Sequence, residues 1–356
     1  MPIFIIAEAG VNHNGSLETA MRLVDAAVEA GADAVKFQTF KAENLVTQQA
    51  DKAAYQKMNT GSDESQFMML KRLELKYEFH FQLFDYCQKQ GIEFLSTAFD
   101  NESLDFLVHE LGIHTLKLPS GEMTNGPFLL AHAQTGKPII LSTGMATLGE
   151  VEAALAVLAF GYMPQHQQPS LTAFRQAYRS EQGQALLRDE VTLLHCTSEY
   201  PTPMANINLK AMDVLQQAFG LRVGYSDHSI GLTVPIAAAA RGATIIEKHY
   251  TLDRAMQGPD HLVSLEPDEL KTMVCSIRDV ESALGNALKC PQPLELENQK
   301  LVRKSLVANC AINQGDCFTE TNLTQKRPGV GRSPMDYWSI LGEKSAQHYD
   351  KDDLIR

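Results

Sequence analysis

Short apolar runs and longer amphipathic stretches alternate along most of the chain. The runs have the length of strands, and the stretches between them repeat apolar residues at helical spacing. Predicted strands occupy residues 3–7, 32–40, 92–96, 115–119, 138–142, 191–196, 222–225 and 243–248. Predicted helices follow them at residues 17–30, 79–90, 102–111, 127–135, 148–160, 209–219, 232–241 and 267–284. Such alternation predicts a parallel sheet of the α/β class, and this number of units predicts a closed (β/α)8 TIM barrel over residues 1–284.

Three segments depart from this rhythm. Residues 41–78 are polar and too long for an ordinary connection, so we expect a loop with short helices near the active site. Residues 161–190 are rich in glutamine, and we expect a surface insertion that is partly helical. Residues 285–300 contain Pro291 and Pro293 and are predicted to be a linker. Residues 301–356 hold short strand-like pieces between turns, which predicts a small, mainly β second domain.

Composition and charge exclude several classes of function. The chain has 44% hydrophobic and 21% charged residues, as soluble globular proteins do. Its net charge of -12 argues against nucleic acid as a partner, because binding to phosphate backbones needs a basic face. No apolar run approaches the roughly 20 residues of a membrane span, and the N-terminus lacks the basic region of a signal peptide. We therefore expect a cytoplasmic protein, whose six scattered cysteines are reduced thiols.

Polar side chains gather at the C-terminal ends of the predicted strands, where TIM-barrel active sites lie. His228 and His249 end the last two strands, so a closed barrel would make them neighbours. Two imidazoles can bind a divalent metal and leave open positions on the ion for water and substrate. Such a metal can polarise an aldehyde as a Lewis acid. The other strand ends supply lysines and hydroxyl groups, which suit a phosphate and a carboxylate ligand, together with one amide and two carboxylates. These residues are Glu8, Lys36, Gln38, Lys117, Ser120, Ser142, Ser198, Ser226 and Glu247.

Each of these residues also has a plainer structural interpretation. A lone histidine after a strand is usually a structural residue, and single lysines are most often solvated surface charges. Glu8 could cap the turn at residues 12–16. The functional interpretation gains weight from the pairing of the histidines on adjacent strands. It gains more from Lys36 and Lys117, which lie within apolar strands, where a buried charge needs a partner.

A set of motifs in the chain resembles the sialic acid synthase family, in order and nearly end to end. They are residues 8–15 (EAGVNHNG), 35–39 (VKFQT), 117–122 (KLPSGE), 140–145 (ILSTGM), 194–201 (LHCTSEYP), 224–228 (GYSDH), 247–249 (EKH) and 258–260 (GPD). Residues 326–331 (KRPGVG) resemble the signature of that family's antifreeze-like (SAF) domain. The occurrence of all these motifs in the same order is far more specific to the family than any single motif. Only residues 161–190 form a longer segment than the family pattern.

The resemblance implies a phosphoenolpyruvate-dependent condensation. Enzymes of this family join phosphoenolpyruvate to the open-chain aldehyde of an N-acylated mannosamine-type sugar, with C–O cleavage and release of phosphate. Residues 96–100 and 118–125 are more similar to the legionaminate synthases, which use a 2,4-diacetamido-6-deoxy sugar, than to the N-acetylneuraminate synthases. The pseudaminate synthases are a weaker match. Two further alternatives are a 3-deoxy-heptulosonate-type synthase and a non-catalytic carbohydrate-binding scaffold.

The resemblance also implies roles for individual residues. His228 and His249 match the metal ligands, for which manganese is preferred, with magnesium, cobalt or zinc as alternatives. The phosphoenolpyruvate pocket is matched by Lys36, Lys117, Ser120, Ser142, Ser198 and Ser226. Of these, Ser198 stands where sialic acid synthases can carry asparagine. Positions near the sugar and the aldehyde are matched by Glu8, Gln38, Tyr200, Glu247 and Asp260, and Glu8 or Glu247 would transfer protons. In the family the small domain reaches across a domain-swapped homodimer, which would place Arg327 in the partner's active site.

Overall fold

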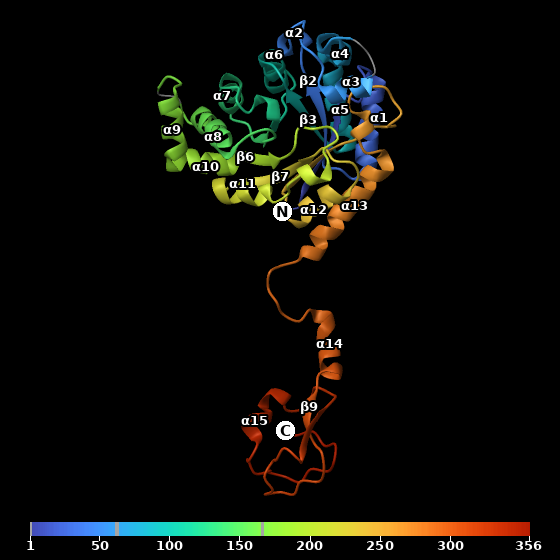
Figure 1. The fold of residues 1–356 in the computed structure, drawn as a ribbon, viewed down its shortest axis with the longest axis vertical. Coiled ribbons are helices and arrows are strands. Elements are labelled where there is room, and N and C mark those ends of the chain that lie inside the picture. The colour runs from blue at the N-terminus through green and yellow to red at the C-terminus, as the bar shows by residue number, and fades with distance from the viewer. Residues whose placement is uncertain (1, 61–63, 165–166) are drawn as a thin grey trace. The chain divides into compact units, whose positions relative to one another are not determined.

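The chain folds into two compact units, Met1–Gly285 and Asn286–Arg356 (Figure 1). The structure is a computed structural model, and it describes residues 2–60, 64–164 and 167–356. Among these residues, no helix has both the length and the apolar composition to cross a membrane.

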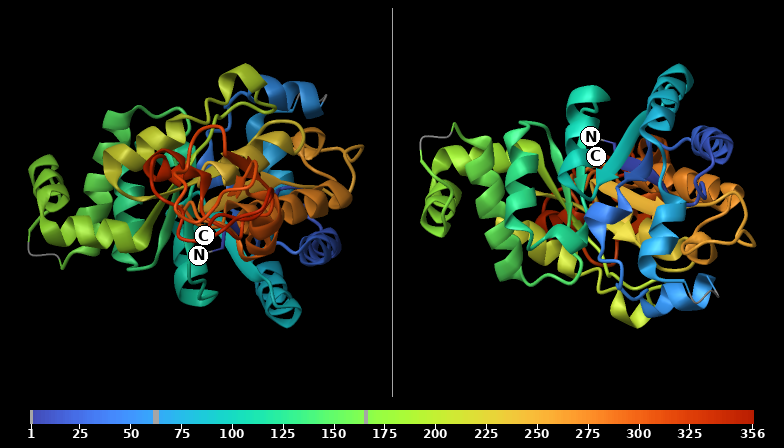
Figure 2. Two further views of the ribbon diagram at one scale, coloured as in Figure 1. Left: turned by 90° about the horizontal axis from the view of Figure 1, so that it is seen from below. Right: turned by 90° about the horizontal axis from the view of Figure 1, so that it is seen from above.

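Eight parallel strands close the first unit into a barrel in chain order, which confirms the predicted (β/α)8 fold. The last strand pairs with the first, with Glu8 opposite His249. Figure 2 shows the helices of this unit outside the strands. The strands are β1 (Phe4–Gly10), β2 (Ala34–Thr39), β3 (Glu93–Ala98), β4 (Leu116–Leu118), β5 (Ile139–Ser142), β6 (Val191–His195), β7 (Arg222–Asp227) and β8 (Ile245–His249).

The helices that cover the barrel begin and end at recognisable capping signals. Ser16 accepts a hydrogen bond from the backbone N–H of Thr19 at the start of the first helix, and Gly31 ends that helix in the left-handed conformation. Thr147 and Glu150 form a capping box. The covering helices are α1 (Leu17–Ala30), α5 (Tyr77–Gln90), α6 (Asn101–Asp105) with the π-helical turn η1 (Phe106–Glu110), α7 (Gly126–Gln134), α8 (Leu148–Tyr162), α11 (Ala211–Phe219), α12 (Thr233–Ala240) and α13 (Pro267–Leu284).

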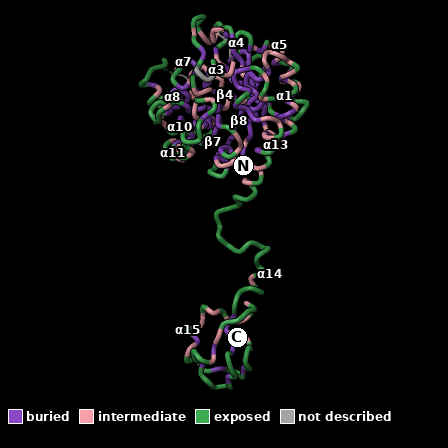
Figure 3. The backbone as a smooth tube through the Cα atoms, turned by 45° about the vertical axis from the view of Figure 1, so that its right-hand side comes forward, coloured by how far each residue is buried: buried purple, intermediate pink, exposed green. Residues whose placement is uncertain are grey.

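Alternation along the strands divides the barrel into an outer and an inner apolar layer. Outward-facing residues pack under the helices in the large core, which appears as the buried centre of this unit in Figure 3. Inward-facing residues form a separate apolar layer of Ile6, Ala34, Leu95, Ile140, Leu194 and Ile245. Side chains on one strand face recur every second residue. The next inward positions toward the C-terminal ends are therefore polar, and the apolar layer is the floor beneath them.

Two of the irregular segments contain the helices that were expected there. Residues 41–78 hold α2 (Ala42–Leu45), α3 (Ala54–Thr60) and α4 (Gln66–Leu73), and residues 61–63 lie outside the described part. The insertion at residues 161–190 holds α9 (Leu171–Arg179) and α10 (Glu181–Glu190), and residues 165–166 are not described. Ser170 and Ser180 cap these two helices with their side-chain oxygens. The insertion is thus more helical than expected, because each helix begins with its own cap.

The second unit begins with a helix in a segment that was predicted to be a linker. Helix α14 (Pro293–Val302) forms because Gln292 and Glu295 make a capping box, and proline is well accommodated in the first turn. The second half of the segment predicted to be a linker, residues 285–300, is therefore helical. Beyond it, β9 (Ser305–Ala308) pairs antiparallel with β10 (Leu323–Lys326). A 3-10 turn (Pro334–Asp336) and α15 (Tyr337–Ile340) follow, around a small core that includes Leu306, Phe318 and Tyr349.

Candidate active site

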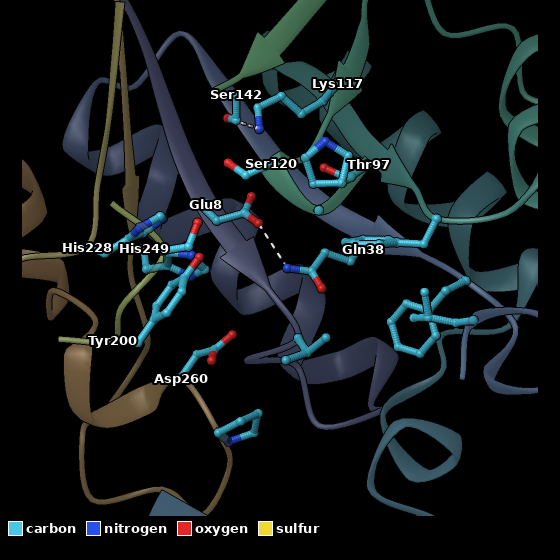
Figure 4. Close-up of a pocket in the computed structure, with 18 of the residues that line it drawn as sticks. Glu8, Gln38, Thr97, Lys117, Ser120, Ser142, Tyr200, His228, His249 and Asp260 are labelled. Atoms are coloured by element: carbon cyan, nitrogen blue, oxygen red, sulfur yellow. Dashed lines mark hydrogen bonds between the residues drawn. The ribbon is translucent and has the colours of Figure 1, made fainter. Parts of the chain in front are cut away.

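One cavity of about 370 Å³ lies at the C-terminal ends of the barrel strands (Figure 4). It brings together the residues of the first unit that the sequence proposed for the site. These are Glu8, Lys36, Gln38, Lys117, Ser120, Ser142, Ser198, Tyr200, Ser226, His228, Glu247, His249 and Asp260. Arg327 belongs to the second unit, where it directly follows β10.

Strand pairing explains why residues so distant in sequence share this cavity. Glu8 pairs with Lys36 across β1 and β2, and Ser226 pairs with Glu247 across β7 and β8. Glu8, Lys36 and Glu247 each lie two residues beyond a member of the apolar floor, so they share its inward face. Ser226, which pairs with Glu247, lies on the same inward face. The floor therefore excludes water from below while the charged layer faces the cavity.

Two buried lysines form the cationic end of the cavity. The Nζ atom of Lys117 donates to Ser142 Oγ at 2.8 Å, and Lys36 Nζ donates to Thr97 Oγ1 at 3.1 Å. Both side chains are almost fully buried, so their charges act in an environment of low dielectric. Figure 4 shows Lys117, Ser142, Ser120 and Thr97 gathered on one side of Glu8.

Two carboxylates balance these lysines. Lys36 Nζ lies 2.7 Å from Glu8 Oε2 and 3.6 Å from Glu247 Oε2, and Lys117 Nζ lies 3.5 Å from Glu247 Oε1. Burial raises the pKa of Glu8, and the charge of Glu247 adds to this shift. Burial alone would also raise the pKa of Glu247, but Lys117, Lys36 and a 2.7 Å hydrogen bond from Ser226 outweigh it and lower the pKa. Glu247 is therefore the anionic partner, and Glu8 is the carboxyl group that can hold a proton near neutral pH.

A compact group of hydroxyl and thiol side chains lies beside the lysines. Ser120 Oγ accepts from the backbone N–H of Gly144 at 2.9 Å and lies 3.2 Å from Cys196 Sγ. A Cβ atom at Gly144 would come within 2.4 Å of Ser198 Oγ and 2.8 Å of Ser120 Oγ. Only glycine lets the backbone approach these hydroxyl groups so closely. The sequence motif at residues 140–145 contained Gly144, but its role depends on contacts that only the fold supplies.

The two histidines lie on the other side of Glu8, beside Tyr200 (Figure 4). Their ring centroids are 5.7 Å apart, and the ring of Tyr200 is 4.1 Å from that of His228. His228 Nδ1 is 2.7 Å from the carbonyl oxygen of Thr197, to which it donates. This bond fixes the tautomer and leaves the electron pair of the neutral ring on Nε2, which lies 3.5 Å from Ser226 Oγ.

Residues 23–289 match the model of the NeuB family. The chain is 48% identical to the N,N'-diacetyllegionaminic acid synthase of Campylobacter jejuni over 99% of this chain and 98% of that protein. The chain therefore belongs to the NeuB family. A second N,N'-diacetyllegionaminic acid synthase, from Legionella pneumophila, is 46% identical over 97% of this chain and 90% of its own length.

A solved structure supports the same assignment of this NeuB family member. The N-acetylneuraminic acid synthetase of Leptospira borgpetersenii, crystallised with citrate, superposes with a TM-score of 0.67 at 34% identity. The match covers 84% of this chain and 90% of that one. The resemblance drawn from the sequence motifs is confirmed by these relatives.

The histidine pair fits a divalent metal. Burial lowers the pKa of both His228 and His249, so both rings are neutral and can act as ligands. His249 Nδ1 is buried and has no hydrogen-bond partner among the described residues. A buried polar atom without a partner is unfavourable, and binding of a metal by this histidine would offset that cost. No group of three or more histidine, cysteine or acidic side chains able to hold a metal occurs in the described chain. Two protein ligands would leave further positions on the ion for substrate and water.

Gln38 and Asp260 occupy two further sides of the cavity. Gln38 Nε2 donates to Glu8 Oε1 at 3.3 Å, on the side of Glu8 opposite the histidines (Figure 4). Burial raises the pKa of Asp260 to about 6. A carboxyl group with this pKa can donate or accept a hydrogen bond near neutral pH.

Sequence reasoning missed the apolar residues of the cavity. Phe40, Met69, Leu70 and Phe99 line it together with Leu45. No motif marks these residues, because an isolated apolar side chain in a polar loop has no chemical signature of its own. The one available signal was the position of Phe40, which continues the inward face of β2 after Lys36 and Gln38.

Proposed function

We propose that this protein condenses phosphoenolpyruvate with the open-chain aldehyde of an N-acylated amino sugar, releasing phosphate and a nonulosonic acid. The proposed acceptor is 2,4-diacetamido-2,4,6-trideoxymannose and the proposed product is N,N'-diacetyllegionaminic acid. One observation carries this proposal: all the barrel residues chosen from the sequence line a single cavity with a cationic end and a histidine pair. The relatives named N,N'-diacetyllegionaminic acid synthase support the choice of sugar.

The cationic end suits phosphoenolpyruvate. Its carboxylate and phosphate would accept hydrogen bonds from Lys36 and Lys117, which are charge-assisted and therefore strong in a buried site. Ser120, Ser142 and Ser198 line the same cavity and would donate to the remaining oxygens. Because Glu8 and Glu247 already pair with the lysines, they hold the cationic side chains in position before the ligand arrives.

The reaction proceeds by two bond-forming events and one cleavage. The C3 atom of phosphoenolpyruvate attacks the aldehyde carbon, and the aldehyde oxygen takes a proton to become a hydroxyl group. Water adds to C2 and loses one proton, which leaves a hydroxyl group on the tetrahedral intermediate. This hydroxyl group then gives its proton to the departing phosphate as the keto C=O bond forms and the C–O bond to phosphate breaks. Glu8, which can hold a proton near neutral pH, is the group proposed to donate the proton to the aldehyde oxygen. Glu247 remains charged and stabilises the lysines.

His228 and His249 are the proposed ligands of a divalent cation. Manganese is preferred, and magnesium, cobalt or zinc are alternatives, since imidazole and oxygen ligands suit several of these ions. When bound, the ion supplies Lewis-acid polarisation of the aldehyde. Tyr200 packs on both rings and so restricts their orientation.

We further propose that the protein acts as a cytoplasmic, domain-swapped homodimer. Six unpaired cysteines, four of them exposed, suit a reducing compartment. The second unit exposes Val330, Met335 and Trp338, apolar side chains that a partner surface would bury. In this arrangement Arg327 would contribute a cation to the cavity of the partner subunit.

Phosphate release tests the reaction directly. The protein is incubated with Mn²⁺, phosphoenolpyruvate and one acceptor at a time, and the product is identified by mass spectrometry. The proposal predicts release with 2,4-diacetamido-2,4,6-trideoxymannose and none without a sugar. Faster turnover of N-acetylmannosamine would favour an N-acetylneuraminate synthase instead. Turnover of an aldose phosphate would favour a heptulosonate-type enzyme, and no turnover with any acceptor would overturn the proposal.

A further inference from the structure

The cavity has an apolar wall on the side of β2 and β3. We define the apolar wall as Phe40, Leu45, Met69, Leu70 and Phe99, all of which line the cavity. These side chains form a hydrophobic cluster of their own, separate from the barrel core and from the barrel floor. The chemistry described above does not use them.

The order of side chains along β2 places this wall at the mouth of the barrel. Lys36, Gln38 and Phe40 are spaced two residues apart, so they share one face of the strand and its continuation. At roughly 3.3 Å per residue, about 13 Å separates the first from the last. Thr97 and Phe99 repeat the order on the neighbouring strand. An acceptor whose aldehyde lies near Lys36 and the histidines would extend its far end toward the wall.

The wall has side chains free to contact a ligand. Phe40 and Phe99 pack edge to face, with ring centroids 6.1 Å apart and an interplanar angle of 89°. Phe40 and Met69 are fully buried and support the surface from behind. Leu45, Leu70 and Phe99 are only half-buried, so part of each is left to cover an apolar group of a substrate.

The polar residues beside the wall are neutral amides. Gln38, Gln56 and Gln66 line this region, and amide side chains can pair with the amide group of an acylamino substituent. Among the described residues that line the cavity, the only lysines or arginines are Lys36 and Lys117, both in the charged layer directly above the barrel floor. The described residues of the wall therefore offer no cationic partner of their own to a phosphate on the far end of a sugar.

We propose that the apolar wall is a specificity subsite for the end of the acceptor sugar that lies far from the aldehyde. It selects a terminal methyl group over a terminal hydroxyl or phosphate group. A hydroxyl group placed against Leu70 and Phe99 would lose its hydrogen bonds to water without replacement, which is unfavourable. This inference rests on the proposed condensation and names the side chains that choose its acceptor.

The test compares two acceptors that differ in one group. These are 2,4-diacetamido-2,4,6-trideoxymannose and its counterpart that carries a hydroxyl group at C6. The wild-type enzyme should prefer the deoxy sugar by about 10- to 100-fold in kcat/KM, the range for a hydroxyl in an apolar pocket. Leu70→Asn, which introduces a hydrogen-bond partner, should reduce this preference at least fivefold, mainly by raising KM for the deoxy sugar. The KM for phosphoenolpyruvate should not change.

Two further variants make the result unambiguous. Phe99→Tyr adds a hydroxyl to the wall from a different element and should shift the preference in the same direction. Leu148→Asn makes the same substitution as Leu70→Asn at a half-exposed position outside the cavity and should leave the preference unchanged. Equal use of both sugars by the wild type, or an unchanged preference in both wall variants, would overturn the subsite while leaving the condensation standing. Absence of phosphate release with either sugar would overturn the condensation and the subsite together.

Discussion

Replacement of Lys248 by methionine tests how the two histidines are held in place. Lys248 alternates with Glu247 and His249, so its side chain points away from the cavity. Its Nζ atom lies 2.6 Å from Asp227 Oδ2, and neither side chain has any exposed surface. Because Asp227 precedes His228 and Lys248 precedes His249, this ion pair joins the strand ends that carry both histidines.

The expected cost follows from burial. Methionine has a similar length but leaves the Asp227 carboxylate without a cationic partner, although the backbone N–H and hydroxyl of Ser229 and the Tyr225 side chain still form hydrogen bonds with it. Removal of one partner from a buried ion pair costs about 3–5 kcal/mol. The matched control is Lys71→Met, since Lys71 lies 2.7 Å from Glu43 with side chains 44% and 53% exposed. An exposed pair of this kind contributes less than about 1 kcal/mol.

Urea unfolding followed by far-ultraviolet circular dichroism measures both losses. The single tryptophan, Trp338, belongs to the second unit, so circular dichroism, to which the barrel helices contribute most, is the more direct measure of barrel unfolding. The double variant Asp227→Asn/Lys248→Met removes the stranded charge and should recover part of the stability. A loss for Lys248→Met no larger than that for Lys71→Met would refute the reasoning. No recovery in the double variant would show that packing, not charge, dominates.

Three further predictions concern the metal, acid and the dimer. His249→Ala should abolish Mn²⁺ binding in a calorimetric titration with the circular dichroism spectrum unchanged; wild-type affinity would exclude this residue as a ligand. Acid should destabilise the barrel, because burial lowers the pKa of His13 to about 3 and of His80 to about 4. Below the unfolded value of about 6.5 the unfolded chain binds more protons than the folded one, so lowering the pH from 7 to 5 should cost about 2 kcal/mol per histidine. Equal urea midpoints at both pH values would contradict this. Finally, mixing Arg327→Ala with His228→Ala subunits should restore activity, and no rescue after subunit exchange would show that Arg327 does not serve the partner.

The sequence predicts the charged part of the site better than its apolar part. Lys36 and Lys117 stand out because a lysine within an apolar strand needs a buried partner, and the barrel topology then states which strand ends meet. Phe99 and Leu70 carry no comparable signal. Their position in the cavity depends on how the segment at 41–78 packs on β2 and β3, which no local pattern encodes.

The same limit explains why the helix in the connecting segment was not predicted. Prolines at residues 291 and 293 predict a break when they are considered alone. Proline in the first turn of a helix loses no backbone hydrogen bond, however, and Gln292 with Glu295 supplies the cap. A residue that ends one element can begin another, and only the following periodic residues distinguish the two cases.

The register of β1 and β2 is fixed by the same residues that form the site. A slip of one residue along β2 would turn Lys36 into the apolar layer beneath the helices and Phe37 into the charged layer, so the alternative register is strongly disfavoured. Pairing nevertheless becomes irregular between Glu8 and Gly10. There Gly10 has a positive φ of 53°, and a Cβ atom would lie 3.3 Å from Gln38 Nε2 and 3.5 Å from the His249 ring. The strand therefore departs from regular pairing at the point where its backbone passes beside the Gln38 amide and the ring of His249, the proposed metal ligand.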